Sequence, residues 1–376
     1  MFRMEYYSSI KEVPCSIWNH FVVRETVNLE MDHLKAIEVS RINDIHPYYF
    51  IGYHENEPVG IAYCFSIQVD LARMAGSYPA EVAIGNTNLM GKRIIEVGHI
   101  ASVGSTIEVQ QPYIRDFLIA LSHKIDEIAC LEKADLCIVR DIDASLYNNF
   151  KILEELGFCP ARGFPIARIP LRWDTFEEYL ASLKSKKRSN IRHKRAKLQT
   201  PEITVEIIED YAPYSKRLSE LWANVAQHNN SYEHEQLTPA YFEAMSRCLK
   251  GRSHVIAIKK QDQIVAYGLN LIGDEEYFGI AGGLDYNVRD EYDLYANNVF
   301  DALCVACKLG KKIFNIGITA YDFKTSIGAE LDPCIYFIKA VKDPSYSAVY
   351  ADLIQKSIKQ PTDIHHRVFG NILNQI

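Results

Sequence analysis

The stretch VIAIKKQDQIVAYGLNLIGDEEYFGIAGGL, residues 255–284, holds three apolar runs separated by polar turns. Apolar runs closed by turn-forming residues predict a meander of three antiparallel strands. Residues 293–312 follow with apolar positions at helical spacing, and residues 312–319 and 334–341 predict two further strands. The sequence therefore predicts a half-molecule in which a meander leads into a long helix and then into more strands.

The same order of elements occurs once before in the chain. Residues 48–70 predict a hairpin, and residues 112–134 predict the long helix of this copy, with a stripe of apolar residues that runs from Phe117 to Leu131. The other elements predicted for this copy are a helix at 33–43, strands at 93–103, 135–142 and 164–171, and a helix at 147–158. This repeated order predicts two tandem copies of one α/β domain with mixed sheets.

The length of 376 residues suits two domains of ordinary size. We predict a first domain at residues 1–172 and a second at residues 173–345, which opens with a basic linker helix at residues 175–198. Residues 346–376 predict a C-terminal helical tail.

Bulk properties exclude several classes of protein. The net charge of −7 argues against a protein built throughout for nucleic acid, so any such contact needs a local basic patch. The N-terminus lacks a signal-peptide pattern and no apolar run is long enough to span a bilayer, so we expect a cytoplasmic protein. Cys304 and Cys307 form an isolated pair on a predicted helix, and we expect no metal site.

Two segments carry a resemblance to a known family. Residues 165–198 combine a strand end, an aromatic and acidic helix start and a Leu-x-x-Lys-x-Arg-x-x-Ile-Arg run. Residues 292–331 end on an aromatic-Lys-x-x-x-Gly motif, Phe323-Lys324…Gly328. With the repeated order of elements, these segments resemble tandem-domain acyltransferases of the GNAT superfamily, in particular the FemABX-like, peptidoglycan-biosynthesis-type and BioF2-like acetyltransferase families.

The resemblance implies a transferase that uses acyl-CoA or aminoacyl-tRNA as co-substrate and has no tightly bound cofactor. In this superfamily the coenzyme A pyrophosphate binds at the start of the long helix, where unpaired N–H groups and the helix dipole favour anions. Neither copy has the usual Gln/Arg-x-x-Gly-x-Gly/Ala signature, and the second copy carries Asp290, Glu291 and Asp293 there. These acids either repel phosphate or cap the helix, and we expect capping.

The predicted linker helix is the strongest local charge feature, with eight Lys and Arg residues and no acid between Lys184 and Lys197. One interpretation is a surface for a polyanion, either tRNA or an acyl carrier, formed by Lys187, Arg188, Arg192 and Arg195. The other is a helix whose cations pair with acids elsewhere in this acidic chain. The sequence leaves both interpretations open.

The candidate reaction site lies just beyond the strand at residues 312–319, because ligands gather at the carboxyl ends of parallel strands. The resemblance assigns Lys324 to the reacting centre or to a donor phosphate. A lysine there could stabilise an oxyanion or hold a phosphate, and Tyr321 could protonate the leaving group. Thr319 ends the strand and is predicted to contact the donor.

A second set of candidates lies on the predicted strands and at the start of the long helix. Asp285 follows a strand end and is the candidate base for an amine acceptor. The predicted donor-binding residues are Asn270, Tyr292, Tyr295 and Asn297. In the first copy, Glu96, His99 and Ser102 alternate near a strand end, but that copy lacks the aromatic-Lys-x-x-x-Gly motif. We therefore expect a degenerate first domain that shapes the acceptor side.

These observations together predict a transferase that moves an acyl or aminoacyl group onto an amine. The expected acceptor is a small molecule of the cell-wall or natural-product type, and acyl-CoA is the favoured donor. Two alternatives remain, an aminoacyl-tRNA-dependent transferase of the FemABX type and a non-catalytic binding protein that keeps the fold. The sequence does not choose the acceptor or the oligomeric state.

Overall fold

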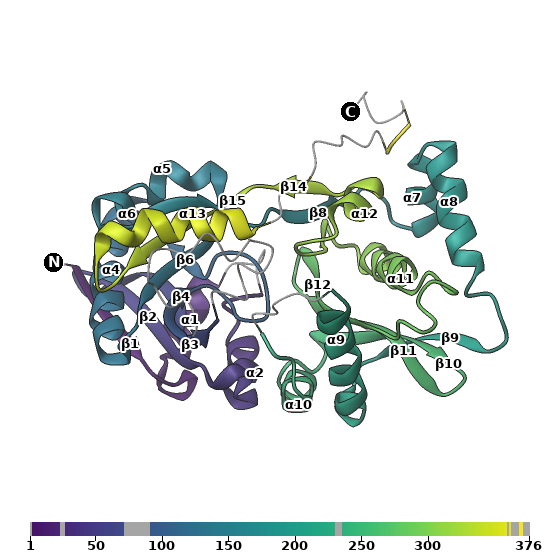
Figure 1. The fold of residues 1–376 in the computed structure, drawn as a ribbon, viewed down its shortest axis with the longest axis horizontal. Helices are drawn as coiled ribbons and strands as arrows, with labels where there is room; N and C mark the ends of the chain where they lie inside the picture. Colours follow the sequence, from purple (N-terminus) through teal and green to yellow (C-terminus); the bar gives the residue numbers. More distant parts are fainter. Residues whose placement is uncertain are drawn as a thin grey trace. The chain divides into compact units, whose positions relative to one another are not determined.

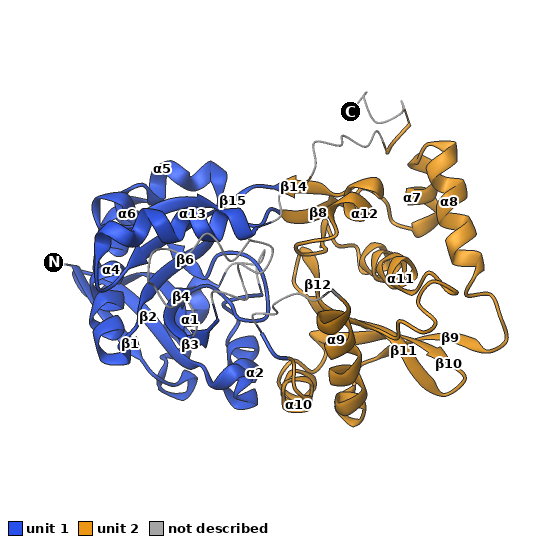
Figure 2. Ribbon diagram, in the orientation of Figure 1, with its two compact units in different colours: residues 1–165, 231–236, 332–360 blue, residues 166–230, 237–331, 361–376 orange. Residues whose placement is uncertain are grey.

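A computed structural model describes residues 2–22, 27–70, 91–229, 235–358, 361 and 368–370. The chain forms two compact units, each with its own mixed sheet (Figures 1 and 2). Unit 1 comprises residues 1–165, 231–236 and 332–360, and unit 2 comprises residues 166–230, 237–331 and 361–376. In the described residues no helix is long and apolar enough to cross a membrane.

The sheet of unit 1 has the order β1-β2-β3-β4-β6-β15-β7, with β5 paired to β3. Its strands are antiparallel except for the parallel pair β4–β6. The strands are β1 (Phe2–Tyr7), β2 (His46–His54), β3 (Glu57–Val69), β4 (Lys92–Val97), β5 (Ile107–Val109), β6 (Leu136–Asp143), β7 (Cys159–Arg162) and β15 (Cys334–Ala340). The helices are α1 (Cys15–Phe21), α2 (Met31–Ser40), α4 (Ile114–Glu132), α5 (Tyr147–Phe150), α6 (Ile152–Glu155) and α13 (Ser347–Ser357).

The sheet of unit 2 has the order β14-β8-β13-β12-β11-β10-β9, and its parallel pair is β12–β13. The strands are β8 (Ile166–Pro170), β9 (Ile203–Ile208), β10 (Ser253–Lys260), β11 (Gln263–Ile272), β12 (Glu276–Leu284), β13 (Ile313–Asn315) and β14 (Glu330–Asp332). The helices are α7 (Phe176–Ser182), α8 (Ser185–Ala196), α9 (Ser215–Asn229), α10 (Pro239–Cys248), α11 (Leu294–Lys308) and α12 (Tyr321–Ser326).

The predicted repeat is present in both units. In each, antiparallel strands lead to a strand, a long helix and a parallel strand, β4-α4-β6 in unit 1 and β12-α11-β13 in unit 2. The apolar stripe of each long helix packs on its own sheet, and these contacts form the main core of each unit. The α/β class with mixed sheets is therefore confirmed.

Two strands join a different sheet from the one predicted. The strand expected to end the first copy, β8, pairs with β13 in unit 2. The strand expected to end the second copy, β15, pairs with β6 and β7 in unit 1. Each sheet is thus completed by a strand predicted for the other domain, and β8 and β15 follow passages of the chain between the units at residues 165–166 and 331–332.

The predicted linker helix at residues 175–198 is two helices, α7 and α8. The Thr175 side chain accepts a hydrogen bond from the Glu178 N–H and so caps the start of α7. Leu183 and Lys184 have extended backbone conformations that separate α7 from α8. In the predicted helical tail, residues 346–376, the helix α13 packs against β7 and β15. Residues 359–360, 362–367 and 371–376 of this prediction lie outside the described residues.

The stripe on α4 provides a stability test. Phe117 is fully buried in the core of unit 1, whereas Leu131, which the spacing placed on the same stripe, is 73% exposed. Phe117→Ala should lower the free energy of unfolding by about 3–5 kcal/mol because it leaves a cavity. Leu131→Ala, the control on the same helix, should leave it nearly unchanged. Chemical denaturation of both variants measures the difference, and equal effects would contradict this packing.

Candidate functional site

The parallel strands of unit 2 part after a short paired stretch. The last matched pair is Phe278 with Asn315. There β13 ends, and Ile316 and Gly317 form backbone hydrogen bonds with Ala167 of β8. Strand β12 continues alone on that side as far as Leu284. Its residues 279–281 are half-buried and Gly282 is exposed. We call this partly exposed edge of β12, beyond its last pair with β13, the opening. Backbone N–H and C=O groups at such an edge can bind a ligand.

A β-bulge lies at this opening. Asn270 on β11 pairs with Gly279 and Leu269 pairs with Ala281, so Ile280 has no cross-strand partner. The Asn270 side chain is buried and donates to the Gly268 carbonyl at 2.9 Å. Its Oδ1 would lie 3.6 Å from a Cβ atom added at Gly279. Asn270 therefore lies beside Gly279, next to a bulge that the sequence did not predict.

The loop that follows β13 is conformationally strained. Gly317, Thr319 and Ala320 have φ values of 68°, 62° and 47°. The left-handed region is unfavourable for a β-branched threonine and costs on the order of 1–3 kcal/mol. A Cβ atom added at Gly317 would lie 3.7 Å from the Gly279 carbonyl oxygen, so this loop borders the opening.

Lys324 on α12 is buried, and its Nζ donates to the carbonyl oxygen of Ile318 in the strained loop. Burial lowers the pKa of Lys324 from its ordinary value to about 7, because the charged form loses its hydration. No carboxylate of the described residues forms an ion pair with it. The amine is therefore largely uncharged at slightly alkaline pH, which differs from the cationic role expected from the sequence.

Tyr321 begins α12 and is buried three residues before Lys324, so the two side chains share one side of the helix. Tyr295, in the first turn of α11, packs on Phe323 with ring centroids 5.1 Å apart. Burial raises the pKa of Tyr295 to about 12. Tyr295 therefore contacts α12, which is necessary if Tyr295 and Lys324 are to belong to one site.

The two remaining candidates for donor binding, Tyr292 and Asn297, make contacts that hold neighbouring parts of unit 2 together. Tyr292 packs in an apolar cluster with Ile203 and donates to the Glu202 carboxylate. Asn297 is fully buried and donates to the carbonyls of Lys194 and Tyr292 at 2.9 and 2.8 Å. Neither contact reaches α12.

The carboxylate of Asp285, the candidate base, contacts Asn287 and Arg217. Its Oδ1 accepts hydrogen bonds from the backbone and side chain of Asn287, both at 3.0 Å. Its Oδ2 lies 3.5 Å from the Arg217 guanidinium. These contacts stabilise a turn after β12 and compete with any catalytic use of the carboxylate.

Three cations of the basic segment, of which Arg195 belongs to the predicted polyanion surface, are neutralised within unit 2. Lys194 and Lys197 form ion pairs with Asp293 at 2.7 and 2.9 Å, and Arg195 pairs with Asp301 at 2.6 Å. Asp293 therefore does not cap α11, contrary to expectation, and its side chain binds α8 instead.

The rest of the basic segment is divided between paired and exposed cations. Arg188 donates to the Ala181 and Leu183 carbonyls at the end of α7, and Arg192 makes an exposed pair with Glu177. The lysines with no acidic partner among the described residues are Lys184, Lys186 and Lys187.

In unit 1 the parallel strands part at the equivalent point, but a side chain crowds the glycine there. Strands β4 and β6 pair as far as Val97 with Val139, so Gly98 and Arg140 correspond to Gly279 and Ile316 of unit 2. A Cβ atom at Gly98 would lie 2.7 Å from Arg140, whereas at Gly279 the nearest atom is 3.6 Å away. A side chain of the protein thus crowds the glycine in unit 1, whereas the glycine of unit 2 has room for a Cβ atom in ordinary van der Waals contact.

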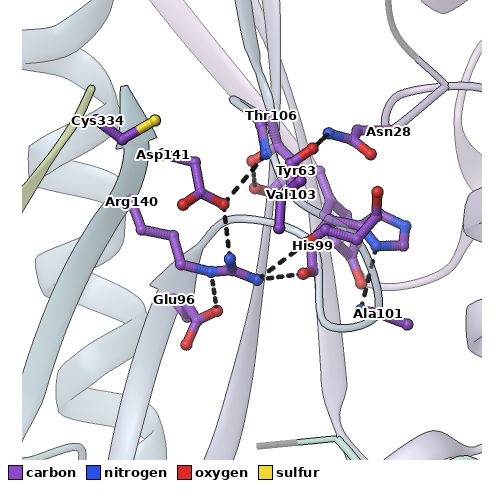
Figure 3. A network of polar contacts seen from close by, with 12 residues as sticks. Asn28, Tyr63, Glu96, His99, Ala101, Val103, Thr106, Arg140, Asp141 and Cys334 are labelled. Carbon is purple, nitrogen blue, oxygen red and sulfur yellow. Dashed lines mark hydrogen bonds and ion pairs between the residues drawn. The ribbon is translucent and has the colours of Figure 1, made fainter. Parts of the chain in front are cut away.

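The guanidinium of Arg140 is held by a buried polar network (Figure 3). It donates to Glu96 at 2.5 Å and to Asp141 at 2.6 Å, and also to the carbonyl oxygens of His99 and Ser102. Burial alone would lower the pKa of Arg140, but the carboxylates of Asp141 and Glu96 raise it above its usual value. The three polar residues that alternate near a strand end in the first copy therefore all bind Arg140, Glu96 through its carboxylate and His99 and Ser102 through their carbonyl oxygens.

A comparison of the two copies in the sequence could have revealed this difference between the units. Each copy has a glycine at the point of parting, and the facing position is arginine in one copy and isoleucine in the other. Among the described residues no group of three or more His, Cys, Asp or Glu side chains is placed to hold a metal ion.

Removal of the Arg140 charge should destabilise unit 1 strongly. Arg140→Met leaves two buried carboxylates, Glu96 and Asp141, without their counter-charge, and should cost about 3–5 kcal/mol. Arg192→Met breaks an exposed pair and should change the free energy of unfolding little. Denaturant titration at neutral pH compares the two. A small effect of Arg140→Met would show that the network does not hold the parted strands.

Lys324 should make stability depend on pH. The unfolded chain has the ordinary lysine pKa of 10.5, so between about pH 7 and 10.5 it holds a proton that the folded protein has released. The free energy of unfolding therefore rises with pH across this window. Lys324→Met removes this dependence, so its stability relative to the unchanged protein should be greater at pH 6.5 than at pH 10. Denaturation at both values tests this, with the exposed Lys308→Met as control.

A family model described as FemAB-like, peptidoglycan biosynthesis/recognition, matches residues 145–293. Putative 8-amino-7-oxononanoate synthase 2 of Mycobacterium tuberculosis is 30% identical over 345 residues, which are 89% of this chain and 45% of that protein. The chain thus spans less than half the length of these curated relatives. The family match ends before α11 and α12, so the Lys324 motif lies outside it.

Solved structures match nearly the whole chain. FemX is 13% identical with a TM-score of 0.56, covering 92% of this chain and 99% of that one. A tandem GNAT protein from the clavulanic acid biosynthesis pathway is 8% identical with a TM-score of 0.55, covering 91% and 99%. The C-terminal domain of a putative lysylphosphatidylglycerol synthetase from Agrobacterium fabrum is 13% identical with a TM-score of 0.52, covering 92% and 98%. The resemblance to FemABX-like and tandem GNAT proteins is confirmed, and the chain shares its fold with FemX and with that tandem GNAT protein.

Proposed function

We propose that the chain is a transferase that moves an acyl or aminoacyl group onto an amine, and that unit 2 binds the donor. The observation that carries this proposal is the opening between β12 and β13 beside Gly279, whose equivalent in unit 1 is filled by Arg140. The fold shared with FemX and with a tandem GNAT protein supports it. Unit 1 would then serve the acceptor side without a donor site of its own.

A chain of contacts links the opening to a titratable group. The strained loop borders Gly279 through Gly317, and the next residue, Ile318, accepts from the Lys324 amine. A donor carbonyl placed at the bulge would meet the backbone of Ile280, which has no cross-strand partner. Backbone dipoles fixed at such a position stabilise the oxyanion of acyl transfer.

Lys324 would act as the proton acceptor in this reaction. The acceptor nitrogen attacks the donor carbonyl carbon, a C–N bond forms, and the bond to the thiolate of coenzyme A or to the ribose oxygen of tRNA breaks. The proton lost by the nitrogen passes to the uncharged Lys324 amine, and Tyr321 protonates the leaving group. A lysine whose pKa lies near 7 suits a base at physiological pH better than an oxyanion partner.

Acyl-CoA remains the favoured donor. The acids predicted to oppose a phosphate at the start of α11 are partly neutralised, because Asp293 is paired with Lys194 and Lys197. Nearby, Arg289 lies over the Tyr286 ring, 4.9 Å from its centroid, and pairs with Asp290. Aminoacyl-tRNA is the second candidate, since the unpaired lysines at the start of α8 suit a polyanion.

Donor binding and turnover should separate in two variants. Gly279→Val adds a side chain whose Cβ has no contact closer than 3.6 Å, and it should reduce donor affinity at least about tenfold. Lys324→Ala should keep donor binding but lose roughly 100-fold in kcat/KM, which for the unchanged protein should fall below about pH 7 as Lys324 becomes protonated. Thermal shift with acyl-CoAs and with aminoacyl-tRNA measures binding. A radiolabelled donor with amine acceptors measures transfer.

The donor and the class of protein are decided by the same measurements. A shift with acyl-CoA that Gly279→Val abolishes supports the favoured donor. A shift with aminoacyl-tRNA alone, weakened by Lys186→Ala, supports the second. No shift with either and no transfer would overturn the transferase proposal in favour of a binding protein.

A further inference from the structure

Val368–Gly370, close to the C-terminus, dock on the connection between α7 and α8. The Lys184 N–H donates to the Val368 carbonyl at 3.1 Å, and the Gly370 N–H donates to the Ser182 carbonyl at 2.9 Å. These bonds form an antiparallel bridge in which Leu183 faces Phe369. The bridge needs extended backbone at Leu183, where the predicted single helix is interrupted. The docked residues thus take part in shaping α7 and α8.

The Phe369 ring lies against the glycine of the aromatic-Lys-x-x-x-Gly motif. A Cβ atom added at Gly328 would lie 2.5 Å from Cζ of Phe369, closer than any real contact. Gly328 also has a φ of 102°, which side chains with a Cβ rarely adopt. The Phe369 ring also packs against Trp173, with ring centroids 5.4 Å apart. The motif glycine is therefore required for Phe369 to pack there.

Gly328 lies in a turn that is anchored on Lys324. The N–H groups of Ile327 and Ala329 both donate to the Lys324 carbonyl oxygen, at 3.2 and 3.0 Å. The Tyr179 hydroxyl on α7 donates to the Ile327 carbonyl at 2.9 Å in a buried position. The end of α12 is thus fixed by Tyr179 on one side and by the ring of Phe369 at Gly328.

We propose that Phe369 is a positioning residue, which holds the end of α12 so that the Lys324 amine stays buried against Ile318. Phe369 does not touch the reacting atoms, and it acts through the turn at residues 327–329. The catalytic consequence rests on the proposed function, whereas the effect on Lys324 itself does not. Undocking Phe369 frees the end of α12 and admits water to the amine, which regains the charged form that burial suppresses.

Chemical labelling of Lys324 tests the proposal without an activity assay. The rate at which acetic anhydride modifies Lys324, followed across pH by mass spectrometry, reports both the exposure and the pKa of the amine. Phe369→Ala should raise the limiting labelling rate at high pH, where the amine is uncharged, at least about fivefold, and move the midpoint of the pH profile from about 7 toward 10.5. Phe369→Leu, which keeps an apolar side chain at Gly328, should restore most of the original profile. Leu309→Ala, at an exposed site in the same unit, is the control.

A second variant separates docking from the loss of an aromatic ring. Gly370→Pro removes the N–H that bonds to Ser182 and leaves Phe369 intact, so it should shift the Lys324 profile in the same direction as Phe369→Ala. An unchanged profile in a folded Phe369→Ala protein overturns the proposal. Loss of cooperative thermal unfolding in both variants also overturns it, because the segment would then be an ordinary part of the core.

The outcome for Phe369 is distinguishable from that for the proposed function. If the labelling profile shifts but no donor is transferred by any variant, positioning of Lys324 stands and the transferase proposal fails. If transfer occurs and Phe369→Ala changes only thermal stability, with the same pH profile of kcat/KM, the transferase stands and positioning fails.

Discussion

In each unit, a parallel pair of strands lies inside a mixed sheet, and the two strands part after three or four residues. A central strand that loses its neighbour leaves backbone donors and acceptors that need new partners. Unit 1 supplies those partners from its own side chains, with Arg140 held by Glu96 and Asp141. Unit 2 presents a bulge and small residues at the same place. The side chain of Arg140 occupies this position in unit 1, whereas unit 2 has small residues there. This difference determines which unit can bind a ligand.

Local pattern was sufficient to predict much of the fold. The spacing of apolar residues located α4 and α11, and turn residues located the hairpins. The spacing did not reveal which sheet β8 and β15 would join, because strand pairing is decided by contacts far apart in the sequence. The break at Leu183 was also invisible, since its cause is a bridge to Phe369 some 186 positions later.

The candidate site was predicted unevenly for similar reasons. Sequence and resemblance pointed to Lys324, but its loss of charge depends on burial, which a lysine in a polar loop does not reveal. The basic segment was read correctly as charged, yet its counter-charges Asp293 and Asp301 lie about a hundred residues away. Arg140 was missed because an Arg-Asp dipeptide ordinarily predicts exposed surface.

The crossed strands bear on how the protein is made. The sheet of unit 1 has β15, residues 334–340, between β6 and β7, so that sheet cannot close while the ribosome is still producing the second half. Until then the edge of β6 is exposed, and unpaired strand edges are sites of misassembly. The sheet of unit 2 has no such delay, because all of its strands lie within residues 166–332. Unit 1 therefore cannot complete its sheet until unit 2 has been synthesised, and it cannot be expressed as a complete domain from one uninterrupted stretch of the sequence.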